Sequence, residues 1–412
     1  MRFITEFIFG SLRLMLRGGK LYWAWMALLA GLIVIGTLAY IEQLQVGMIT
    51  TNLRDPVSWG FYIGNFTFLV GVAAAAVVLV IPAYIYDWKP IKEIVILGEL
   101  LAISAIVMCM LFVTVDIGHP ERFWHLLPII GRPNFPRSLL SWDVLVLTLY
   151  LCLNLFIATH ILFRWYHKRE YNKKLAVPLI LLSIPAAVSI HTVTAFLYNG
   201  LAARSFWNSA ILAPRFLTSA FCSGPAIILI LLQVIRKYWG LNIKNEALQK
   251  IAELMAYAMF INLFLFGAEI FREFYSDTHH LIHYRYLFKG LHGHHALVPF
   301  AWVSVFCSVV AFLLFLIPRT RKNFVTLNIG AVLIYIGVYI EKGVALVVPG
   351  FTPSMLGEIY EYQPSLLEWK VAAGIFAIGF MIFTLLLKVA IPVMTGRVDK
   401  ERPPSKLGRT AA

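Results

Sequence analysis

The chain has 412 residues, of which 60% are of apolar types and 14% are charged, and its mean hydropathy is +0.78. A soluble domain is about 45–50% apolar and about 25% charged, so the composition argues against a soluble enzyme, a disordered protein or a nucleic-acid-binding protein. The net charge of +14 fits a multi-span membrane protein, because such proteins collect Lys and Arg on their cytoplasmic side. Four cysteines are too few for a disulfide framework.

The apolar residues form about ten stretches that are long enough to cross a bilayer as helices. The segment 1–21 mixes apolar and basic residues, which predicts a cytoplasmic amphipathic helix on the membrane surface. The segment 394–412 has two prolines among scattered charges, which predicts a disordered cytoplasmic tail. The predicted fold class is therefore an all-α polytopic membrane protein with a transmembrane domain over 22–393. Its expected spans are 22–43, 58–86, 93–117, 138–166, 175–199, 210–237, 248–274, 293–318, 323–347 and 366–393.

Lys and Arg are unevenly divided between the two expected sides of the membrane. Roughly two-thirds of them lie at the N-terminus, at the C-terminus and in every second loop, and the remainder lie on the other side. The positive-inside rule therefore predicts a multi-pass protein of the cell membrane with both termini in the cytoplasm.

A weak internal similarity points to a duplication. An offset of 154 residues aligns Gly98-Glu99-Leu100 with Ala252-Glu253-Leu254 and lays one set of four spans over another. The resulting prediction is two parallel four-helix bundles, over 58–199 and 210–347, with the first and last spans outside them. The alternative is that evenly spaced spans share an offset by chance.

Ionisable residues within spans are costly and usually functional, and here most of them gather near the predicted outer ends. This pattern favours a functional site at the outer face. The alternative is a solvated interface of side chains whose heads reach water, which suits the arginines better than the short carboxylates. The residues near outer span ends are Asp116, Asp143, Arg204, Arg215, Glu269, Arg272, Glu273 and Glu341, and the outer loops add His119 and the histidine-rich segment 279–295.

Two carboxylates, Glu99 and Glu253, lie in the inner halves of their spans and correspond under the proposed duplication. One interpretation is a proton path. The other is a buried, protonated glutamate that bonds to a neighbouring helix.

No haem, iron–sulfur cluster or metal is expected in this chain. Only His160 and His191 lie well inside spans, and their depths differ by roughly 20 Å at the rise of an α-helix, so one haem iron cannot bind both. The cysteines lie in separate spans and form no iron–sulfur motif. The loop histidine spacings, H-H-x-x-H and H-x-H-H, match no specific metal site. A quinone fits an outer polar pocket, because histidine and carboxylate groups bond its ring and carry its protons.

Five segments resemble the NrfD/PsrC family, the polysulfide-reductase-type membrane subunits. They are DIGHPERFWH at 116–125, SLLSWD at 138–143, HTVTAFLYN at 191–199, APRF at 213–216 and FTPSMLGEIYE at 351–361. The resemblance covers about residues 20–395, and the ten-span length and the last segment point to the DsrP branch, also described as Hdr-like menaquinol oxidoreductase membrane subunits.

The resemblance implies a menaquinone-interacting subunit of an anaerobic respiratory complex that is not catalytic alone and is linked to sulfate or sulfur reduction. Menaquinone would be the substrate. The implied partners are an extracytoplasmic ferredoxin-like iron–sulfur subunit that takes or gives the electrons, a multihaem cytochrome c, a haem b membrane subunit and a cytoplasmic iron–sulfur catalytic subunit.

The resemblance also implies where quinone contacts lie. Asn65 occupies the place of a quinone-contacting polar residue in shorter relatives, whereas Leu69 stands where some relatives have histidine. The expected catalytic residues are Asp116, His119, Asp143 and His191, and the expected quinone-binding residues are Asn65, Asp116, His191, Arg204, Arg215 and Glu269. Asp116 could instead orient Arg122, His191 could be an interior histidine with its bonds satisfied, and the two arginines could hold the loops.

Two other functions stay open from the sequence. A proton-coupled transporter would suit ten spans and a repeat, but its site is usually near the midplane between interrupted helices, and no paired interrupted spans are expected here. A pure membrane anchor would use the outer polar residues for docking alone.

Overall fold

The computed structural model describes residues 2–127, 130–277, 280–354 and 356–398. Within these residues the secondary structure is helical and ten helices are long and apolar enough to span a membrane. The predicted all-α polytopic fold is confirmed. Most of the predicted tail lies outside the described residues.

The spanning helices begin and end within a few residues of the expected spans, except where a span is interrupted. They are α2 (Lys20–Val46), α3 (Phe61–Ala73) with α4 (Ala75–Val80), α6 (Val95–Asp116), α7 (Leu139–Tyr166), α8 (Lys173–Asn199), α9 (Leu212–Trp239), α10 (Asn245–Ser276), α12 (Val298–Leu316), α14 (Phe324–Lys342) with α15 (Val344–Phe351), and α16 (Leu366–Met394). Short helices join some of them: η1 (Met48–Thr50), η2 (Ile81–Ile85), α5 (Lys89–Lys92), η3 (Pro120–Leu126), η4 (Ser205–Trp207), α11 (Leu281–Lys289) and α13 (Pro318–Lys322).

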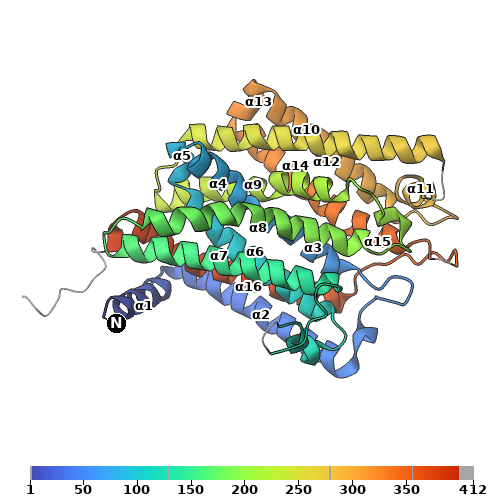
Figure 1. The fold of residues 1–412 in the computed structure, drawn as a ribbon, viewed down its shortest axis with the longest axis horizontal. Coiled ribbons are helices and arrows are strands. Elements are labelled where there is room, and N and C mark those ends of the chain that lie inside the picture. Colours follow the sequence, from blue (N-terminus) through green and yellow to red (C-terminus); the bar gives the residue numbers. More distant parts are fainter. Residues whose placement is uncertain (1, 128–129, 278–279, 355, 399–412) are drawn as a thin grey trace, which may run out of the picture.

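The spans pack as two groups that share a long interface (Figure 1). In the first helix group, α3 and α4 pack on α6, α6 on α7, and α7 on α8. In the second helix group, α9 packs on α10, α10 on α12, α12 on α14, and α14 back on α9. Helices α3, α4 and α8 of the first group contact α9 of the second, and α3 also contacts α14. The interface between the groups is therefore built mainly around α3 and α9.

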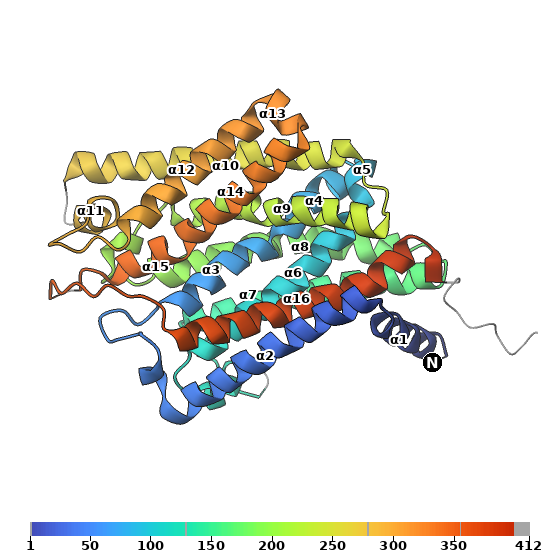
Figure 2. The same cartoon turned by 180° about the vertical axis from the view of Figure 1, so that it is seen from behind.

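Helices α2 and α16, the first and last spans, pair with each other and cover the first group through contacts of α16 with α6 (Figure 2). The pair is close because two glycines face each other: a Cβ on Gly36 would lie 2.6 Å from the Gly374 Cα. Small residues let backbones approach where the surrounding lipid gives no hydrophobic drive for helices to associate.

Two spans are interrupted, and the two interruptions do not lie at corresponding places under the proposed duplication. Helix α3 ends at Ala73, α4 follows after Ala74, and the same span ends in the π-helical turn η2, which contains Pro82. Proline lacks the N–H that continues a helix, which accounts for the irregular turn. The second interruption, at Gly343 between α14 and α15, faces α3, where a Cβ on Gly64 would lie 3.2 Å from the Gly343 Cα. The interruptions allow α3 and α14 to touch.

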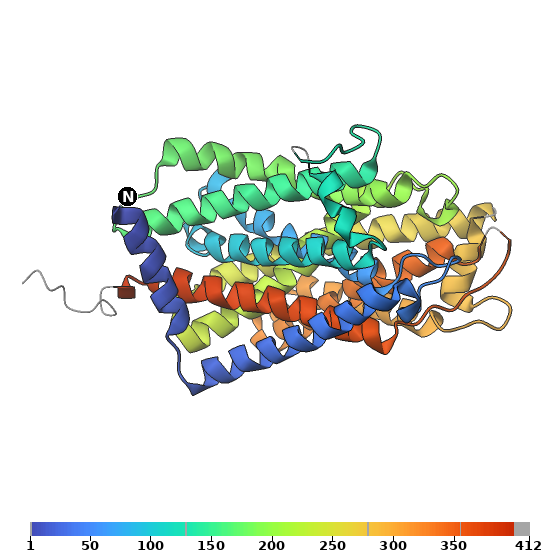
Figure 3. The ribbon, with the colours of Figure 1, turned by 90° about the horizontal axis from the view of Figure 1, so that it is seen from below.

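Helix α1 (Arg2–Leu16) lies across one end of the spans rather than along them (Figure 3). Phe7 packs edge-on against Phe163 and Tyr166 at the end of α7, while Phe3, Ile4 and other apolar residues stay exposed. This is the arrangement of a helix in a membrane surface. We call this end of the molecule the α1 end and the opposite end, where α11 and α15 lie, the α11 end (Figures 1 and 2).

The histidine-rich segment expected as a solvated loop contains a helix, α11. Its His283, Tyr284 and Tyr286 are buried, so the helix is folded against the ends of the spans and is part of the protein interior. Residue His279 lies outside the described residues.

Candidate functional site

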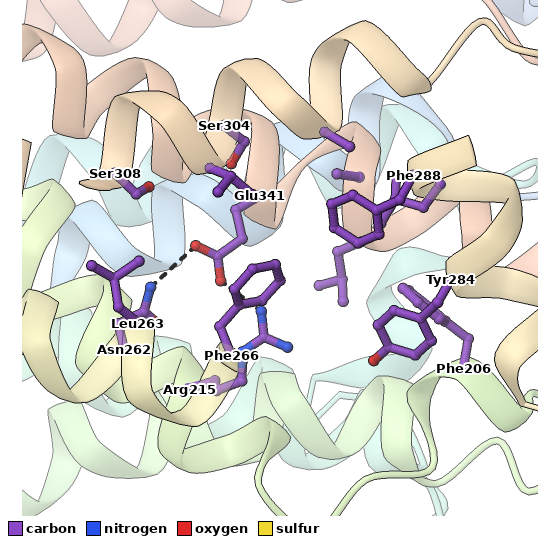
Figure 4. A pocket seen from close by; sticks show the side chains of 15 residues that line it. Phe206, Arg215, Asn262, Leu263, Phe266, Tyr284, Phe288, Ser304, Ser308 and Glu341 are labelled. Atoms are coloured by element: carbon purple, nitrogen blue, oxygen red, sulfur yellow. Dashed lines mark hydrogen bonds and ion pairs between the residues drawn. The ribbon is translucent and has the colours of Figure 1, made fainter. Parts of the chain in front are cut away.

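A pocket lies in the second helix group toward the α11 end, between α9, α10, α11, α12, α14 and α15. Its empty space, counted together with the open mouth, is about 560 Å³. We call it the ring pocket. Its lining residues include Phe206, Arg215, Asn262, Leu263, Phe266, Tyr284, Phe288, Ser304, Val305, Ser308 and Glu341 (Figure 4).

The floor of the ring pocket is a network of buried polar groups centred on Arg215. Its Nη1 donates to the carboxylate of Glu269, and its Nη2 donates to Glu341 Oε1 at 2.8 Å. The other oxygen of Glu341 accepts from the Asn262 amide at 3.2 Å. The guanidinium also lies 5.1 Å from the centre of the Phe266 ring. A charge-assisted network of this kind holds both carboxylates in fixed positions.

A second cation completes the network. The Lys342 ammonium lies 3.8 Å from Glu341 Oε1 and 4.2 Å from the centre of the Phe216 ring. The buried quartet therefore has two positive and two negative side chains, namely Arg215, Lys342, Glu269 and Glu341. An unbalanced charge at this depth would be costly, so the balance is what allows the group to be buried.

The walls of the ring pocket are aromatic, with a few hydroxyl groups. Phe206, Tyr284 and Phe288 face Phe266 and Glu341 across the pocket (Figure 4). The Ser308 hydroxyl has no hydrogen-bond partner among the described residues. Burial, and then the charge of Glu269, raise the pKa of the Tyr284 phenol, so that it stays a donor.

The rim of the ring pocket consists of half-buried apolar side chains, Leu263, Phe266, Phe288 and Val305. Next to them, Phe264 of α10 and Phe306 of α12 are exposed. The mouth therefore opens between α10 and α12 onto an apolar, membrane-facing surface.

The loops at the α11 end close the ring pocket from above. His283 bonds the Thr352 carbonyl through Nδ1 at 3.2 Å and the Ser205 hydroxyl through Nε2 at 3.0 Å. Burial is the main cause that lowers the pKa of His283, which keeps the ring neutral and suited to both bonds. Arg204, an expected quinone contact, instead lies 4.7 Å from the centre of the Phe351 ring and does not line the pocket.

The expected catalytic residues of the first helix group do not share one pocket. Asp143 is buried and accepts from the Thr194 hydroxyl at 2.9 Å. Asp116 lies at the end of α6, and its Oδ1 has no partner among the described residues. His119 is on the surface, 3.0 Å from Glu121. None of these three side chains lines the ring pocket.

Asn65 and His191 lie near the interface between the helix groups. The Asn65 amide is engaged at both atoms: its oxygen accepts from the Tyr339 hydroxyl of α14 at 2.8 Å, and its nitrogen donates to the Phe61 carbonyl at 2.8 Å. His191 lines a small cavity of about 210 Å³ together with Lys342. The small cavity leaves too little room for a quinone ring beside these side chains.

Glu99 and Glu253 have different surroundings. Glu99 is 2% exposed and lies in the wall of a large cavity that opens at the α1 end beside Lys89, Lys92 and Arg169. Glu253 is half-exposed, bonds Lys250 at 3.2 Å and accepts from the Tyr257 hydroxyl at 2.9 Å. Only Glu99 is placed in the interior, where a proton path needs it.

Sequence reasoning missed two members of the network around Arg215, namely Asn262 and Lys342. Glu341 was visible only as one of several acids near a span end, and Asn262 and Lys342 did not attract notice. The available signal was a lone amide in the apolar run of α10 and the adjacent opposite charges Glu341-Lys342 in an apolar span.

The network gives the ring pocket a defined chemistry. A flat aromatic ligand would stack on phenylalanine and tyrosine rings, hydroxyl and amide groups would bond its oxygens, and Glu341 is a carboxylate positioned to accept a proton. Among the described residues, no group of three metal-binding side chains lies together.

Comparison with known proteins places the chain in a family. The family model "Polysulphide reductase, NrfD" matches residues 49–352. The selenate reductase of Mesobacillus selenatarsenatis has a subunit that is 26% identical over 91% of this chain and 94% of its own length. The Hdr-like menaquinol oxidoreductase integral membrane subunit of Archaeoglobus fulgidus is 20% identical over 89% of this chain and 93% of its own length. The integral membrane subunit of menaquinone reductase from Nitratidesulfovibrio vulgaris is 23% identical over 92% of this chain and 93% of its own length.

The resemblance read from the sequence motifs is thereby confirmed, and the relatives are membrane subunits of oxidoreductase complexes. The chain belongs to the NrfD family of polysulphide-reductase-type membrane proteins.

Proposed function

We propose that the chain is the menaquinone-binding membrane subunit of an anaerobic respiratory complex and that the quinone ring binds in the ring pocket. The single observation that carries this proposal is the pocket itself, which combines an aromatic wall, a positioned carboxylate and a mouth toward lipid. A quinone needs these three features, because its ring is flat, its reduction moves protons, and its isoprenoid tail stays in the membrane.

The proposed reaction takes two electrons and two protons from the quinol in two one-electron steps, and Glu341 accepts the proton of each step in turn. Glu341 accepts a quinol proton, and the Tyr284 and Ser308 hydroxyls donate hydrogen bonds to the ring oxygens. The electrons pass to a ferredoxin-like iron–sulfur subunit docked at the α11 end, which supplies the one-electron acceptor. The chain's own residues bind and orient the ring and move its protons.

The rest of the complex follows the family resemblance. We propose a cell-membrane location with the α1 end in the cytoplasm, supported by the basic residues gathered there, such as Lys89, Lys168 and Arg169. The proposed further partners are a multihaem cytochrome c, a haem b membrane subunit and a cytoplasmic iron–sulfur catalytic subunit, in a pathway of sulfate or sulfur reduction. Two relatives are named as subunits of a selenate reductase and a putative dimethyl sulfoxide reductase, so selenate and dimethyl sulfoxide are the competing proposals for the terminal electron acceptor.

The test is a titration of the fluorescent quinol analogue 2-heptyl-4-hydroxyquinoline N-oxide into the purified protein. Val305→Trp closes the rim, and Val309→Trp puts the same side chain one helical turn further along α12, outside the pocket. We expect saturable quenching that Val305→Trp weakens at least tenfold and Val309→Trp leaves within twofold of wild type.

The remaining outcomes separate the alternatives. Quenching that Val305→Trp leaves intact, while Asp116→Asn or His191→Ala weakens it, would move the ring to the first helix group. Wild-type protein without saturable quenching would contradict a quinone role and favour a transporter or a membrane anchor. Solute-gradient collapse in vesicles would then identify the transporter.

A further inference from the structure

A groove at the α1 end of the second helix group lies apart from the ring pocket. It runs between the end of α9 and the start of α14, and its empty space, counted together with its open side, is about 970 Å³. We call it the end groove. Its polar lining residues are Gln233, Arg236, Lys237, Tyr238 and Asn328, and no carboxylate is among the described residues that line it.

The Arg236 guanidinium is held in place with part of its bonding capacity unused. Its Nη1 donates to the Asn245 side-chain oxygen at 2.6 Å and to the Ile243 carbonyl at 3.4 Å, and the group lies 5.1 Å from the centre of the Phe324 ring. Its Nε and Nη2 have no hydrogen-bond partner among the described residues. A guanidinium carries its donors in a rigid fork that matches two oxygens of a phosphate, so this free edge suits a phosphate group.

Lys237 adds a second positive charge beside Arg236. Its ammonium lies 5.5 Å from the centre of the Tyr238 ring, and within the described part of the chain no carboxylate pairs with it. Lys250, at the same end of the molecule, is by contrast paired with Glu253 at 3.2 Å. Two cations without a compensating anion attract an anionic ligand.

Deeper in the end groove, two amides join α9 to α14. The Gln233 Nε2 donates to Asn328 Oδ1 at 2.6 Å, and Asn328 Nδ2 donates back to Gln233 Oε1 at 3.2 Å. An amide nitrogen carries two hydrogens, and the second hydrogen of Asn328 Nδ2 has no acceptor in the part of the chain that the structure describes. Gln233 lies one turn, or about 6 Å, inward from Lys237 along α9. The end groove therefore offers a neutral donor below its two cations.

The inner part of the end groove continues into the apolar surface of the spans. Ile230 and Val234 of α9 line it, and Ile329 of α14, next to Asn328, is exposed. Tyr238 at the outer edge is 68% exposed, as expected for an aromatic residue at a membrane–water interface. A free phosphate ion has no use for this apolar surface, whereas a phospholipid needs it for its acyl chains. The combination favours a lipid as the occupant.

We propose that the end groove binds an anionic phospholipid. Arg236 and Lys237 bind its phosphate, and the Asn328 amide donates to an ester carbonyl oxygen. An acyl chain lies along Ile230 and Val234. A lipid with a net negative charge, such as phosphatidylglycerol, binds more tightly than phosphatidylcholine, because the choline cation is repelled by the two basic side chains. The bound lipid joins α9 to α14 and stabilises the second helix group, whether or not the ring pocket holds a quinone.

The first test is thermal unfolding of the purified full chain in an uncharged detergent with dioleoylphosphatidylglycerol, dioleoylphosphatidylcholine or sodium phosphate added. A ligand that binds only the folded state raises the unfolding midpoint. We expect phosphatidylglycerol to raise the midpoint saturably, with a half-maximal concentration at least tenfold below that of phosphatidylcholine. Equal effects of the two lipids would overturn the anionic-lipid site. The same rise with sodium phosphate would overturn a lipid as the occupant and assign the groove to a soluble anion.

The decisive variant is Lys237→Glu, because this side chain is exposed and its charge can be reversed without disturbing the interior. Lys173→Glu is the matched control, since it reverses an exposed lysine at the start of α8, at the same end of the molecule. We expect the half-maximal concentration of phosphatidylglycerol to rise at least tenfold in Lys237→Glu and to stay within twofold of wild type in Lys173→Glu. Equal changes in both variants would reveal a general charge effect and refute the end groove as the site.

A second measurement needs no variant. Phosphatidylglycerol that carries a photoreactive diazirine on one acyl chain is added to the purified chain and irradiated, and the labelled peptides are mapped by mass spectrometry. We expect labels on α9 around Ile230 and Val234 and on α14 around Ile329, reduced at least fivefold by excess unlabelled phosphatidylglycerol. Labels absent from both helices, or unaffected by the excess, would contradict the site, whatever quinol analogues do in the ring pocket.

Discussion

Removing one member of the buried charge quartet should unbalance the other three. Glu341→Gln leaves Arg215 with Glu269 as a partner but takes the nearby carboxylate away from Lys342. Lys342→Met does the reverse and leaves an excess negative charge. The double variant leaves one cation and one anion, Arg215 and Glu269, and restores the balance. We therefore expect the two single variants to lose, in sum, more free energy of unfolding than the double variant loses.

The size of the effect follows from the geometry. Two unit charges 3.8 Å apart interact by about 4 kcal/mol at an effective dielectric constant of about 20, which is an upper limit for the pair. Breaking a buried pair by removing one partner costs about 3–5 kcal/mol, and Arg215 keeps a second partner, so we expect about 3 kcal/mol for Glu341→Gln. The coupling energy between Glu341 and Lys342 should be about 1–3 kcal/mol.

The assay is equilibrium unfolding in mixed micelles with increasing dodecyl sulfate, followed by tryptophan fluorescence for the wild type, both single variants and the double variant. Lys250→Met and Glu253→Gln form the control cycle, because that pair is 3.2 Å apart but partly exposed. Exposed pairs contribute up to about 1 kcal/mol. Single effects at Glu341 and Lys342 that add within about 0.5 kcal/mol would refute the idea of a coupled quartet.

Three further expectations concern the frame around the site. Gly36→Leu should force α2 from α16 and cost about 2 kcal/mol of unfolding free energy, whereas Gly31→Leu, where a Cβ meets nothing within 4 Å, should be near neutral in the same unfolding assay. Tyr362→Phe removes the hydroxyl that donates to the buried Glu368 and should lower stability by about 2 kcal/mol; an unchanged midpoint would show that the carboxylate finds another donor. The pKa of His283 is lower in the folded protein than in the unfolded chain, so the neutral ring contributes to the free energy of unfolding. This contribution is present above the unfolded pKa of about 6.5 and is lost as the pH falls through the lower folded pKa. The midpoint temperature of thermal unfolding, measured from pH 8 to pH 5, should therefore change less with pH in His283→Gln than in the wild type. Equal changes in the two proteins would contradict this expectation.

The spans were predictable because each one is a long apolar run, and this signal is local. The interruption at Gly343 was not, because it depends on a neighbour: Gly343 breaks its span where α14 meets Gly64 of α3. Helix α11 was missed for a similar reason. Its polar and histidine-rich sequence resembles a solvated loop, and burial of His283 against Thr352 is a contact that no local pattern shows.

The candidate site was predictable in part. Arg215 and Glu269 were selected for their cost within spans, and the structure pairs them. Their partners came from distant segments, since Asn262 belongs to α10 and Glu341 to α14. Asn65 was selected by family resemblance, and its acceptor is used by Tyr339 across the interface between the helix groups. Pairing across an interface depends on how helices rotate against each other, which a single sequence does not reveal.

The pairing of α2 with α16 has a consequence for how the protein is made. Helices α3 to α15 lie between α2 and its main packing partner α16 in the chain order, so a long stretch of chain must be synthesised before Gly36 and Gly374 meet. Until then, the face of α2 that later packs against α16 is exposed to lipid, and so is the surface of α6 that α16 later covers. A chain without α16 therefore exposes to lipid both the Gly36 face of α2 and the matching surface of α6.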